Sequence, residues 1–166
     1  MTDFIRGINT LYLDCDGVLA DFDFVAEGVL GMKPTEFEDK HGSDEFWGKL
    51  GKVDHFYASL PLMHDALELY DAVKHMRPVI LTGAPKHFGE DAIVDKYRWI
   101  AEKFGVFQRG IVCQSKHKFR YCIPGDIIVD DTPRHRRKWE EVGGTWVHHV
   151  SAEYSIAALR EMGIIE

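Results

Sequence analysis

The sequence has no long hydrophobic run and few cysteines. Across its 166 residues no apolar stretch approaches the roughly 20 residues of a membrane-spanning helix, and residues 1–7 lack the pattern of a signal peptide. We therefore expect a cytoplasmic protein without a membrane partner. The three cysteines are spaced neither like a zinc site nor like a disulfide framework, which favours reduced thiols.

Net positive charge is also lacking, because 27 acidic residues outnumber 20 lysines and arginines. The formal net charge of −7 repels polyanions, so no nucleic-acid polymer is expected as a partner. A small anion can still bind to such a chain where a metal ion and a lysine reverse the charge locally. The one dense basic run, residues 134–138, is predicted to be mainly a solvated helix face, with phosphate binding as its alternative.

Apolar, strand-like runs alternate with helical patterns along most of the chain. The predicted strands are residues 8–13, 79–81, 111–113, 127–129 and 145–150. The predicted helices are residues 65–76, 90–104, 134–142 and 152–162. This alternation predicts an α/β fold, a Rossmann-like parallel sheet with helices on both faces.

One segment interrupts the alternation. Residues 22–62 show no strand pattern and are too long for an ordinary loop, so we expect a small helical cap inserted after the first strand. Residues 1–21 and 63–166 would form the core. The aromatic residues of the cap either fill its own interior or face a substrate ring as part of a lid. The candidates for substrate contact are Phe22, Phe46, Trp47 and Phe56.

Four polar pieces follow apolar runs, and a parallel sheet would bring them to one edge. They are residues 14–21, the Thr82-Gly83 pair, Lys118 and the Asp130-Asp131 pair. Together they supply a nucleophile, an acid, a hydroxyl group, an ammonium group and metal ligands. That is the inventory of a phosphoryl-transfer site.

Asp14 and Asp16 lie two residues apart on a strand, so they point the same way if the strand runs straight into a turn at Gly17. One carboxylate can then attack phosphorus while the other protonates the leaving oxygen and later activates water. An isolated Asp-x-Asp pair would more often be a turn or a helix cap. The three companion pieces favour the catalytic interpretation.

Asp130 and Asp131 would repel the first pair of acids unless a cation lay between them. Mg²⁺ suits such a site, because protein carboxylates, phosphate and water can share its coordination. Alternatively, Asp131 caps the next helix, with Pro133 in its first turn. The two roles are compatible if Asp130 is the ligand and Asp131 the cap or an outer partner.

Thr82 and Gly83 offer a hydroxyl group and backbone N–H groups of the kind that hold phosphate oxygens. A lysine near them would stabilise the charge that builds up on the phosphoryl group. Lys116 and Lys118 both qualify by their position in the chain.

The ordered motifs resemble those of the haloacid dehalogenase superfamily of phosphohydrolases, whose first motif reads Asp-x-Asp-Gly followed by an apolar pair. Residues 16–22, Asp-Gly-Val-Leu-Ala-Asp-Phe, are similar to the 5'(3')-deoxyribonucleotidases within it. So are Phe56-Tyr57 with Leu60-Pro61, residues 96–100, and residues 125–131. The likeness covers nearly the whole chain and is weak within the cap.

The resemblance implies that Asp14 is the nucleophile, which forms an aspartyl-phosphate, and that Asp16 is the general acid and base. It implies that Asp14, the main-chain carbonyl of Asp16, and Asp130 hold Mg²⁺. Thr82 and Gly83 would bind phosphate. The family often places its lysine three residues after a Ser or Thr, which here favours Lys118, with Lys116 as the alternative.

The family's second motif often reads Thr-Ser-Pro, whereas this chain has Thr82-Gly83-Ala84-Pro85 and so lacks one hydroxyl group. The expected activity is a Mg²⁺-dependent phosphomonoesterase for nucleoside monophosphates, with deoxy forms favoured. The alternatives are a phosphatase for a sugar phosphate or a nucleic-acid end, and a non-hydrolytic module that accepts phosphate on Asp. The sequence leaves open the base, the 5' or 3' position and the oligomeric state.

Overall fold

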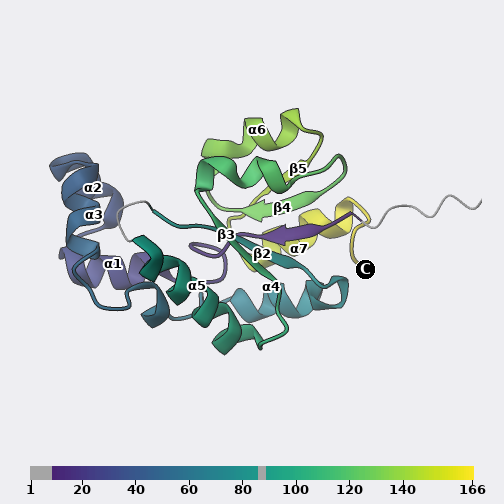
Figure 1. The fold of residues 1–166 in the computed structure, drawn as a ribbon. Coiled ribbons are helices and arrows are strands. Elements are labelled where there is room, and N and C mark those ends of the chain that lie inside the picture. Colours follow the sequence, from purple (N-terminus) through teal and green to yellow (C-terminus); the bar gives the residue numbers. More distant parts are fainter. Residues whose placement is uncertain (1–8, 86–88) are drawn as a thin grey trace, which may run out of the picture.

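A five-stranded parallel sheet lies at the centre of the computed structural model, which describes residues 9–85 and 89–166 (Figure 1). Its strands are β1 (Leu11–Leu13), β2 (Val79–Gly83), β3 (Gly110–Cys113), β4 (Ile127–Asp130) and β5 (Thr145–His148). Their order across the sheet is β3-β2-β1-β4-β5. The predicted α/β fold class is confirmed. The expected first residue of the first strand, Ile8, lies outside the described residues.

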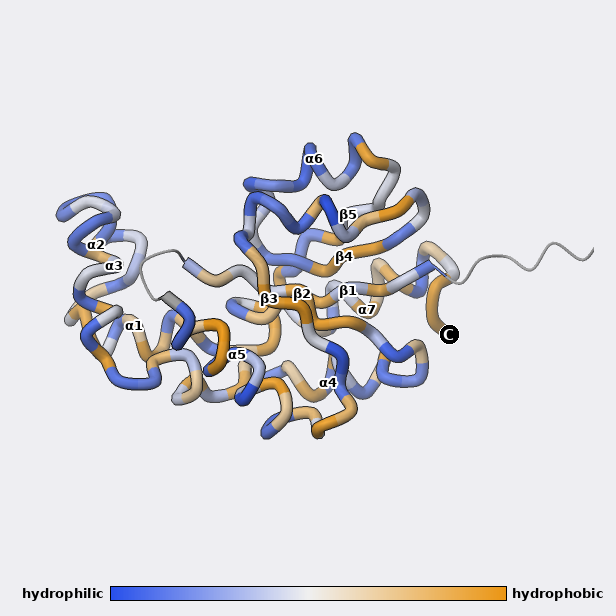
Figure 2. The backbone as a smooth tube through the Cα atoms, in the orientation of Figure 1, coloured by the Kyte–Doolittle hydropathy of each residue, from blue (hydrophilic) through white to orange (hydrophobic). Residues whose placement is uncertain are grey.

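Helices cover both faces of the sheet. The flanking helices are α4 (Ala66–Val73), α5 (Gly89–Phe104), α6 (Arg136–Glu141) and α7 (Ala152–Glu161). Alternate residues of a strand point to opposite faces. Leu11 and Leu13 therefore pack in one cluster with Leu69 of α4 and Leu159 of α7, and Tyr12 packs in another with Trp139 of α6. Figure 2 shows that the central strands are mostly hydrophobic, whereas α6 is mostly hydrophilic.

The described residues also form four short 3-10 helices: η1 (Tyr57–Ser59), η2 (Lys74–Met76), η4 (Ser115–Tyr121) and η5 (Pro133–His135). Two of them account for differences from the expected helices. The predicted helix 65–76 is α4 followed by η2, and the predicted helix 134–142 is η5 followed by α6. In both places the regular α-helix is shorter than its hydrophobic pattern.

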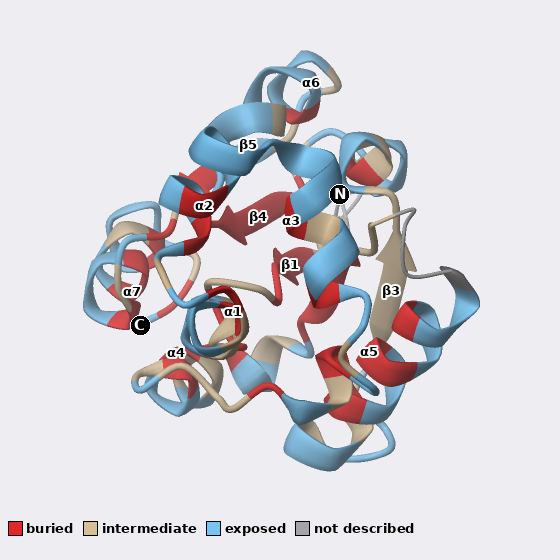
Figure 3. Ribbon diagram, turned by 90° about the vertical axis from the view of Figure 1, so that its left-hand side faces the viewer, coloured by how far each residue is buried: buried red, intermediate tan, exposed pale blue. Residues whose placement is uncertain are grey.

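The long segment between β1 and β2 holds α1 (Phe22–Leu30), α2 (Pro34–His41) and α3 (Ser43–Leu50). Asp21 begins α1 by accepting a hydrogen bond from the Phe24 N–H at 3.1 Å, and Gly31 ends it at a φ of 76°. The three helices lie beyond the carboxyl ends of the strands (Figures 1 and 3). They thus stand over the edge at which the polar pieces converge.

The chain enters and leaves this segment through two neighbouring stretches. The Asp21 N–H donates to the Pro61 carbonyl, and the Met63 N–H donates to the Leu19 carbonyl, both at 2.8 Å. These stretches coincide with the predicted borders of the cap, although the division into core and cap stays a prediction. No helix among the described residues is long and apolar enough to cross a membrane. All three cysteines are free.

Candidate active site

Asp14, Lys118 and Asp130 meet at the carboxyl end of the sheet. Asp14 directly follows β1 and Asp130 ends β4, so the parallel pairing of these strands puts the two acids side by side. Lys118 comes from η4, and its Nζ lies 2.7 Å from Oδ1 of Asp14 and 2.7 Å from Oδ2 of Asp130. All three side chains are buried. The structure thus gathers three of the residues predicted for catalysis and metal binding.

The two acids keep Lys118 charged. Burial acts to lower the pKa of Lys118, but the adjacent Asp14 and Asp130 carboxylates outweigh it, so the pKa is raised. Lys116, the alternative lysine, is exposed and points into a neighbouring cavity. Geometry therefore favours Lys118 over Lys116 as the lysine of the reaction.

A third carboxylate, that of Asp131, lies beside those of Asp14 and Asp130. Carboxylate oxygens of Asp14, Asp130 and Asp131 lie within 4.8 Å of one another. Burial, and then the charges of Asp14 and Asp130, raise the pKa of Asp131 to about 7. Such a set of mutually repelling hard oxygen donors fits Mg²⁺. The alternative helix-cap role of Asp131 is wrong, because Thr132 is the N-cap residue of η5 and no side chain caps that helix.

The turn after the first two acids requires glycine. Gly17 has a φ of 80°, which side chains other than glycine rarely adopt, and the Asp131 carboxylate lies where a Cβ atom would stand. After it, Val18, Leu19 and Ala20 fold back so that their N–H groups all reach the Cys15 carbonyl. This tight loop fixes the backbone conformation after β1 and with it the position of Asp16.

Asp16 is held by a lysine that the sequence analysis did not single out as a site residue. Lys96 of α5 is buried, and its Nζ lies 2.7 Å from Oδ2 of Asp16 and 3.0 Å from Oγ1 of Thr82. Burial is the main cause that raises the pKa of Asp16, and the Lys96 charge opposes it. The sequence does contain a signal that Lys96 is buried. It recurs at helical spacing with the residues of the buried face of α5, which are Ala92, Trp99 and Ile100.

Thr82 and Gly83 end β2 but have different surroundings. The Thr82 side chain is fully buried, accepts the Lys96 hydrogen bond and does not line the cavities at the site. Gly83 lines both cavities, and the Ser115 hydroxyl occupies the place of its missing Cβ. Gly83 is therefore accessible for the predicted contact with phosphate. The Thr82 hydroxyl group instead bonds to Lys96, away from the cavities.

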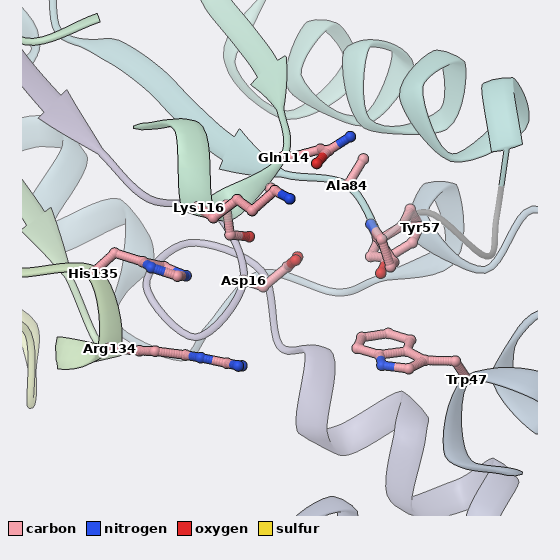
Figure 4. A pocket seen from close by; sticks show the side chains of 11 residues that line it. Asp16, Trp47, Tyr57, Ala84, Gln114, Lys116, Arg134 and His135 are labelled. Atoms are coloured by element: carbon pink, nitrogen blue, oxygen red, sulfur yellow. The ribbon is translucent and has the colours of Figure 1, made fainter. Parts of the chain in front are cut away.

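Two adjoining cavities open on the acids. The smaller, of about 210 Å³, is lined by Asp14, Asp16, Lys118 and Asp130 among others. The larger, of about 460 Å³, begins at Asp16. Figure 4 shows Trp47 and Tyr57 on one side of it and a basic group on the other. That basic group is Lys116, Arg134 and His135.

The basic run 134–138 is divided between two environments. Arg136 and Arg137 form exposed ion pairs with Glu140 and Glu141, each at 2.8 Å, as expected of a solvated helix face. Arg134 and His135 instead line both cavities. Burial, followed by the charges of nearby basic residues, lowers the pKa of His135. The solvated helix face is thus found at Arg136 and Arg137, and phosphate binding stays a prediction for the two residues that line the cavities.

The expected aromatic contacts with a substrate are only partly possible. Phe46 and Phe56 are 4% and 1% exposed and pack against Phe22, with ring centroids 6.5 and 5.4 Å apart respectively. They fill the interior of the inserted segment, so the prediction that they face a substrate is wrong. Trp47 does line the larger cavity, and Tyr57, which was not among the candidates, joins it. Phe22 lines a separate acidic cavity of about 310 Å³.

No family model matches the chain, and no curated protein matches its sequence. Solved structures do share its fold. The L-2-haloacid dehalogenase of Xanthobacter autotrophicus is 15% identical at a TM-score of 0.54, over 93% of this chain and 82% of that one. The same enzyme with chloropropionic acid covalently bound gives 14% identity and a TM-score of 0.52, over 95% and 84%.

A hydrolase from Streptococcus pneumoniae TIGR4 is similar over 95% of this chain and 98% of its own, at 12% identity and a TM-score of 0.52. Identities this low establish the fold alone. The chain therefore has the fold of the haloacid dehalogenases, with a strongly acidic site at the carboxyl ends of its strands.

Proposed function

We propose that this protein is a Mg²⁺-dependent phosphomonoesterase that hydrolyses nucleoside monophosphates through an aspartyl-phosphate on Asp14. The observation that carries the proposal is the contact of Lys118 with both Asp14 and Asp130, beside the third carboxylate of Asp131. A buried cation next to the nucleophile stabilises the charge of a transferring phosphoryl group. Asp130 and Asp131 supply the oxygen ligands that a magnesium ion prefers.

In the first step, a carboxylate oxygen of Asp14 would attack phosphorus, while the Asp16 carboxyl gives its proton to the leaving oxygen as that bond breaks. In the second, Asp16 would take a proton from water, whose oxygen attacks phosphorus and releases Asp14. When bound by Asp14, Asp130 and Asp131, with the Asp16 carbonyl, Mg²⁺ would supply positive charge to the phosphoryl oxygens. Lys118, which contacts both Asp14 and Asp130, would add to this charge.

The same acidic group argues against the substrates of the structurally similar dehalogenases. A haloacid is itself a carboxylate, and the carboxylates of Asp130 and Asp131 beside the nucleophile would repel it. A phosphate ester instead brings oxygens that share a metal ion with those acids. Phosphorus is therefore favoured over carbon as the centre that Asp14 attacks.

The larger cavity supports a nucleotide as the substrate. The Trp47 ring offers a flat apolar surface for a base, with the buried Tyr57 ring beside it, and Lys116 and Arg134 lie across the cavity with positive charge. The cavity begins at Asp16, where the leaving oxygen would emerge. A sugar phosphate would use the basic side and leave the rings uncovered.

A phosphate-release screen with nucleoside monophosphates and sugar phosphates, with and without Mg²⁺, tests the proposal. We expect release from nucleotides only with the metal, none from the Asp14→Asn variant, and unchanged release from the control variant Asp39→Asn on the exposed side of α2. Equal rates for all esters would exclude a nucleotide preference. A stable phosphoprotein without phosphate release would indicate a phosphate-accepting module, and chloride release from haloacids a dehalogenase.

A Trp47→Ala variant tests the stacking surface separately. We expect a higher KM for nucleotides with little change in the KM for a small sugar phosphate, because only the base contact is lost. An equal effect on both substrates would assign the cavity to the protein's own packing.

A further inference from the structure

We infer that Lys96 is a positioning residue for the reaction: its hydrogen bond to Oδ2 holds the Asp16 carboxyl group in the orientation from which it transfers the proton. The inference rests on the proposed function, because it takes Asp16 as the general acid and base. It adds an ammonium group from α5 to the site and makes the orientation of Asp16 depend on that group.

The contacts of Lys96 define its position closely. Its Nζ donates to Oδ2 of Asp16 at 2.7 Å and to Oγ1 of Thr82 at 3.0 Å, and it lies 4.2 Å from the centroid of the Tyr57 ring. The side chain is only 2% exposed. An ammonium group buried this deeply with a carboxylate, a hydroxyl group and an aromatic face has little freedom to move.

The helix that carries Lys96 is itself fixed to the segment that closes the insert. Trp99, one turn further along α5, donates from Nε1 to the Leu60 carbonyl at 2.6 Å. Asp95, the residue before Lys96, accepts a hydrogen bond from Nδ1 of His55 at 2.9 Å. The ammonium group is therefore positioned by the same contacts that hold η1 against α5.

The two oxygens of Asp16 have unequal surroundings. Oδ2 accepts the Lys96 hydrogen bond, whereas Oδ1 is buried and has no hydrogen-bond partner among the described residues. Asp16 lines both cavities of the site. The side chain of Asp16 is nevertheless 27% exposed, so its exposed part, which lines the cavities, is not Oδ1. The Lys96 contact to Oδ2 therefore fixes the orientation in which the Asp16 carboxyl group faces the site.

Loss of Lys96 should therefore impair proton transfer more than phosphoryl transfer. An alcohol leaving group needs the Asp16 proton in the first step, whereas p-nitrophenolate leaves without one. The second step needs Asp16 as a base for every substrate. The two kinds of substrate separate a role through Asp16 from a loss of structure, because a structural defect would slow both alike.

The experiment uses the full chain with Lys96→Met, an unbranched replacement that removes the charge, and measures rapid-mixing kinetics with p-nitrophenyl phosphate and a nucleoside monophosphate. With p-nitrophenyl phosphate we expect a burst of about one p-nitrophenolate per active site, then a turnover at least about 10-fold slower than that of the wild type. With the nucleotide we expect slow release without a burst. Lys103→Met, an exposed lysine on the same helix, should behave as wild type.

Wild-type kinetics in Lys96→Met, or an equal loss on both substrates without a burst, would overturn the inference. Thermal unfolding verifies that the variant folds. If it does not, Thr82→Val removes only the second hydrogen bond of the ammonium group, and the same burst must then appear. If the wild type hydrolyses neither ester, the proposed function fails; if only the variant behaves unexpectedly, the role of Lys96 alone fails.

Discussion

The ammonium nitrogen of Lys118 lies 2.7 Å from Oδ1 of Asp14, the residue proposed to attack phosphorus. The same nitrogen lies 2.7 Å from Oδ2 of Asp130, and none of the three side chains is appreciably exposed. One buried cation is therefore the shared partner of two buried anions. Its removal must affect stability as well as catalysis.

Lys118→Met should lower turnover by about 10²-fold or more, because the phosphoryl charge loses its fixed cation. Measured without metal, the free energy of unfolding should fall by about 3–5 kcal/mol, since two buried acids lose their partner. Urea unfolding and phosphate release provide the two measurements. Lys116→Met, at an exposed lysine, should keep the stability and change KM rather than kcat; a reversed pattern would assign the reaction to Lys116.

Added Mg²⁺ should raise the unfolding temperature of the protein. The carboxylates of Asp14, Asp130 and Asp131 repel one another, and a cation that binds only the folded state relieves that repulsion. At 100 times the dissociation constant the gain is about 2.7 kcal/mol. Calorimetry with Mg²⁺ and with a chelator tests this.

The variant Asp131→Asn should reduce the Mg²⁺-dependent shift, and Asp39→Asn should not. An undiminished shift in Asp131→Asn would show that Asp131 is not a ligand and would leave Asp14, Asp130 and the Asp16 carbonyl as the set. A shift of the same size with Na⁺ would indicate general screening of charge and no specific site.

The sheet was predictable because its signal is local and strong. Buried runs such as residues 127–129 have few other interpretations, and polar residues that end parallel strands must meet at one edge. This rule located Asp14 and Asp130 without any knowledge of the tertiary structure. The inserted helices lack such a signal, because their aromatic residues suit either an interior or a surface.

The rest of the site depends on tertiary contacts that a linear pattern does not contain. Phe46 and Phe56 pack against Phe22, while Trp47, next in sequence to Phe46, reaches a cavity. One residue along a helix turns the side chain by about 100°, so only the packing of α3 decides which aromatic residue lines the cavity. Lys96 was overlooked because lysine is rarely buried, although its helical spacing placed it on the inner face.

Gly17→Ala should destabilise the protein and weaken its response to Mg²⁺. A residue other than glycine at a φ of 80° costs about 1–2 kcal/mol, and the new Cβ would also meet the Asp131 carboxylate. Gly31→Ala is a matched control, because Gly31 has a φ of 76° and open space around it. Chemical unfolding should give a similar backbone cost in both variants, with the Mg²⁺ response lost only in Gly17→Ala.

His55 and Asp95 should make the stability of the protein depend on pH. The hydrogen bond to Asp95 and then its charge raise the pKa of His55, so the folded state holds the proton more tightly than the unfolded one. The contribution is complete below the unfolded pKa of about 6.5 and is lost as the pH rises through the folded value.

The variant His55→Asn tolerates the φ of 50° at this position and removes the titrating group. Urea unfolding at about pH 5.5 and pH 8.5 should give a difference in stability between wild type and variant that is larger at the lower pH. His75→Asn, at an exposed histidine, should show no such change. A difference that grows toward high pH would contradict the ion pair and would assign the contact to a neutral His55 that donates to the Asp95 carboxylate.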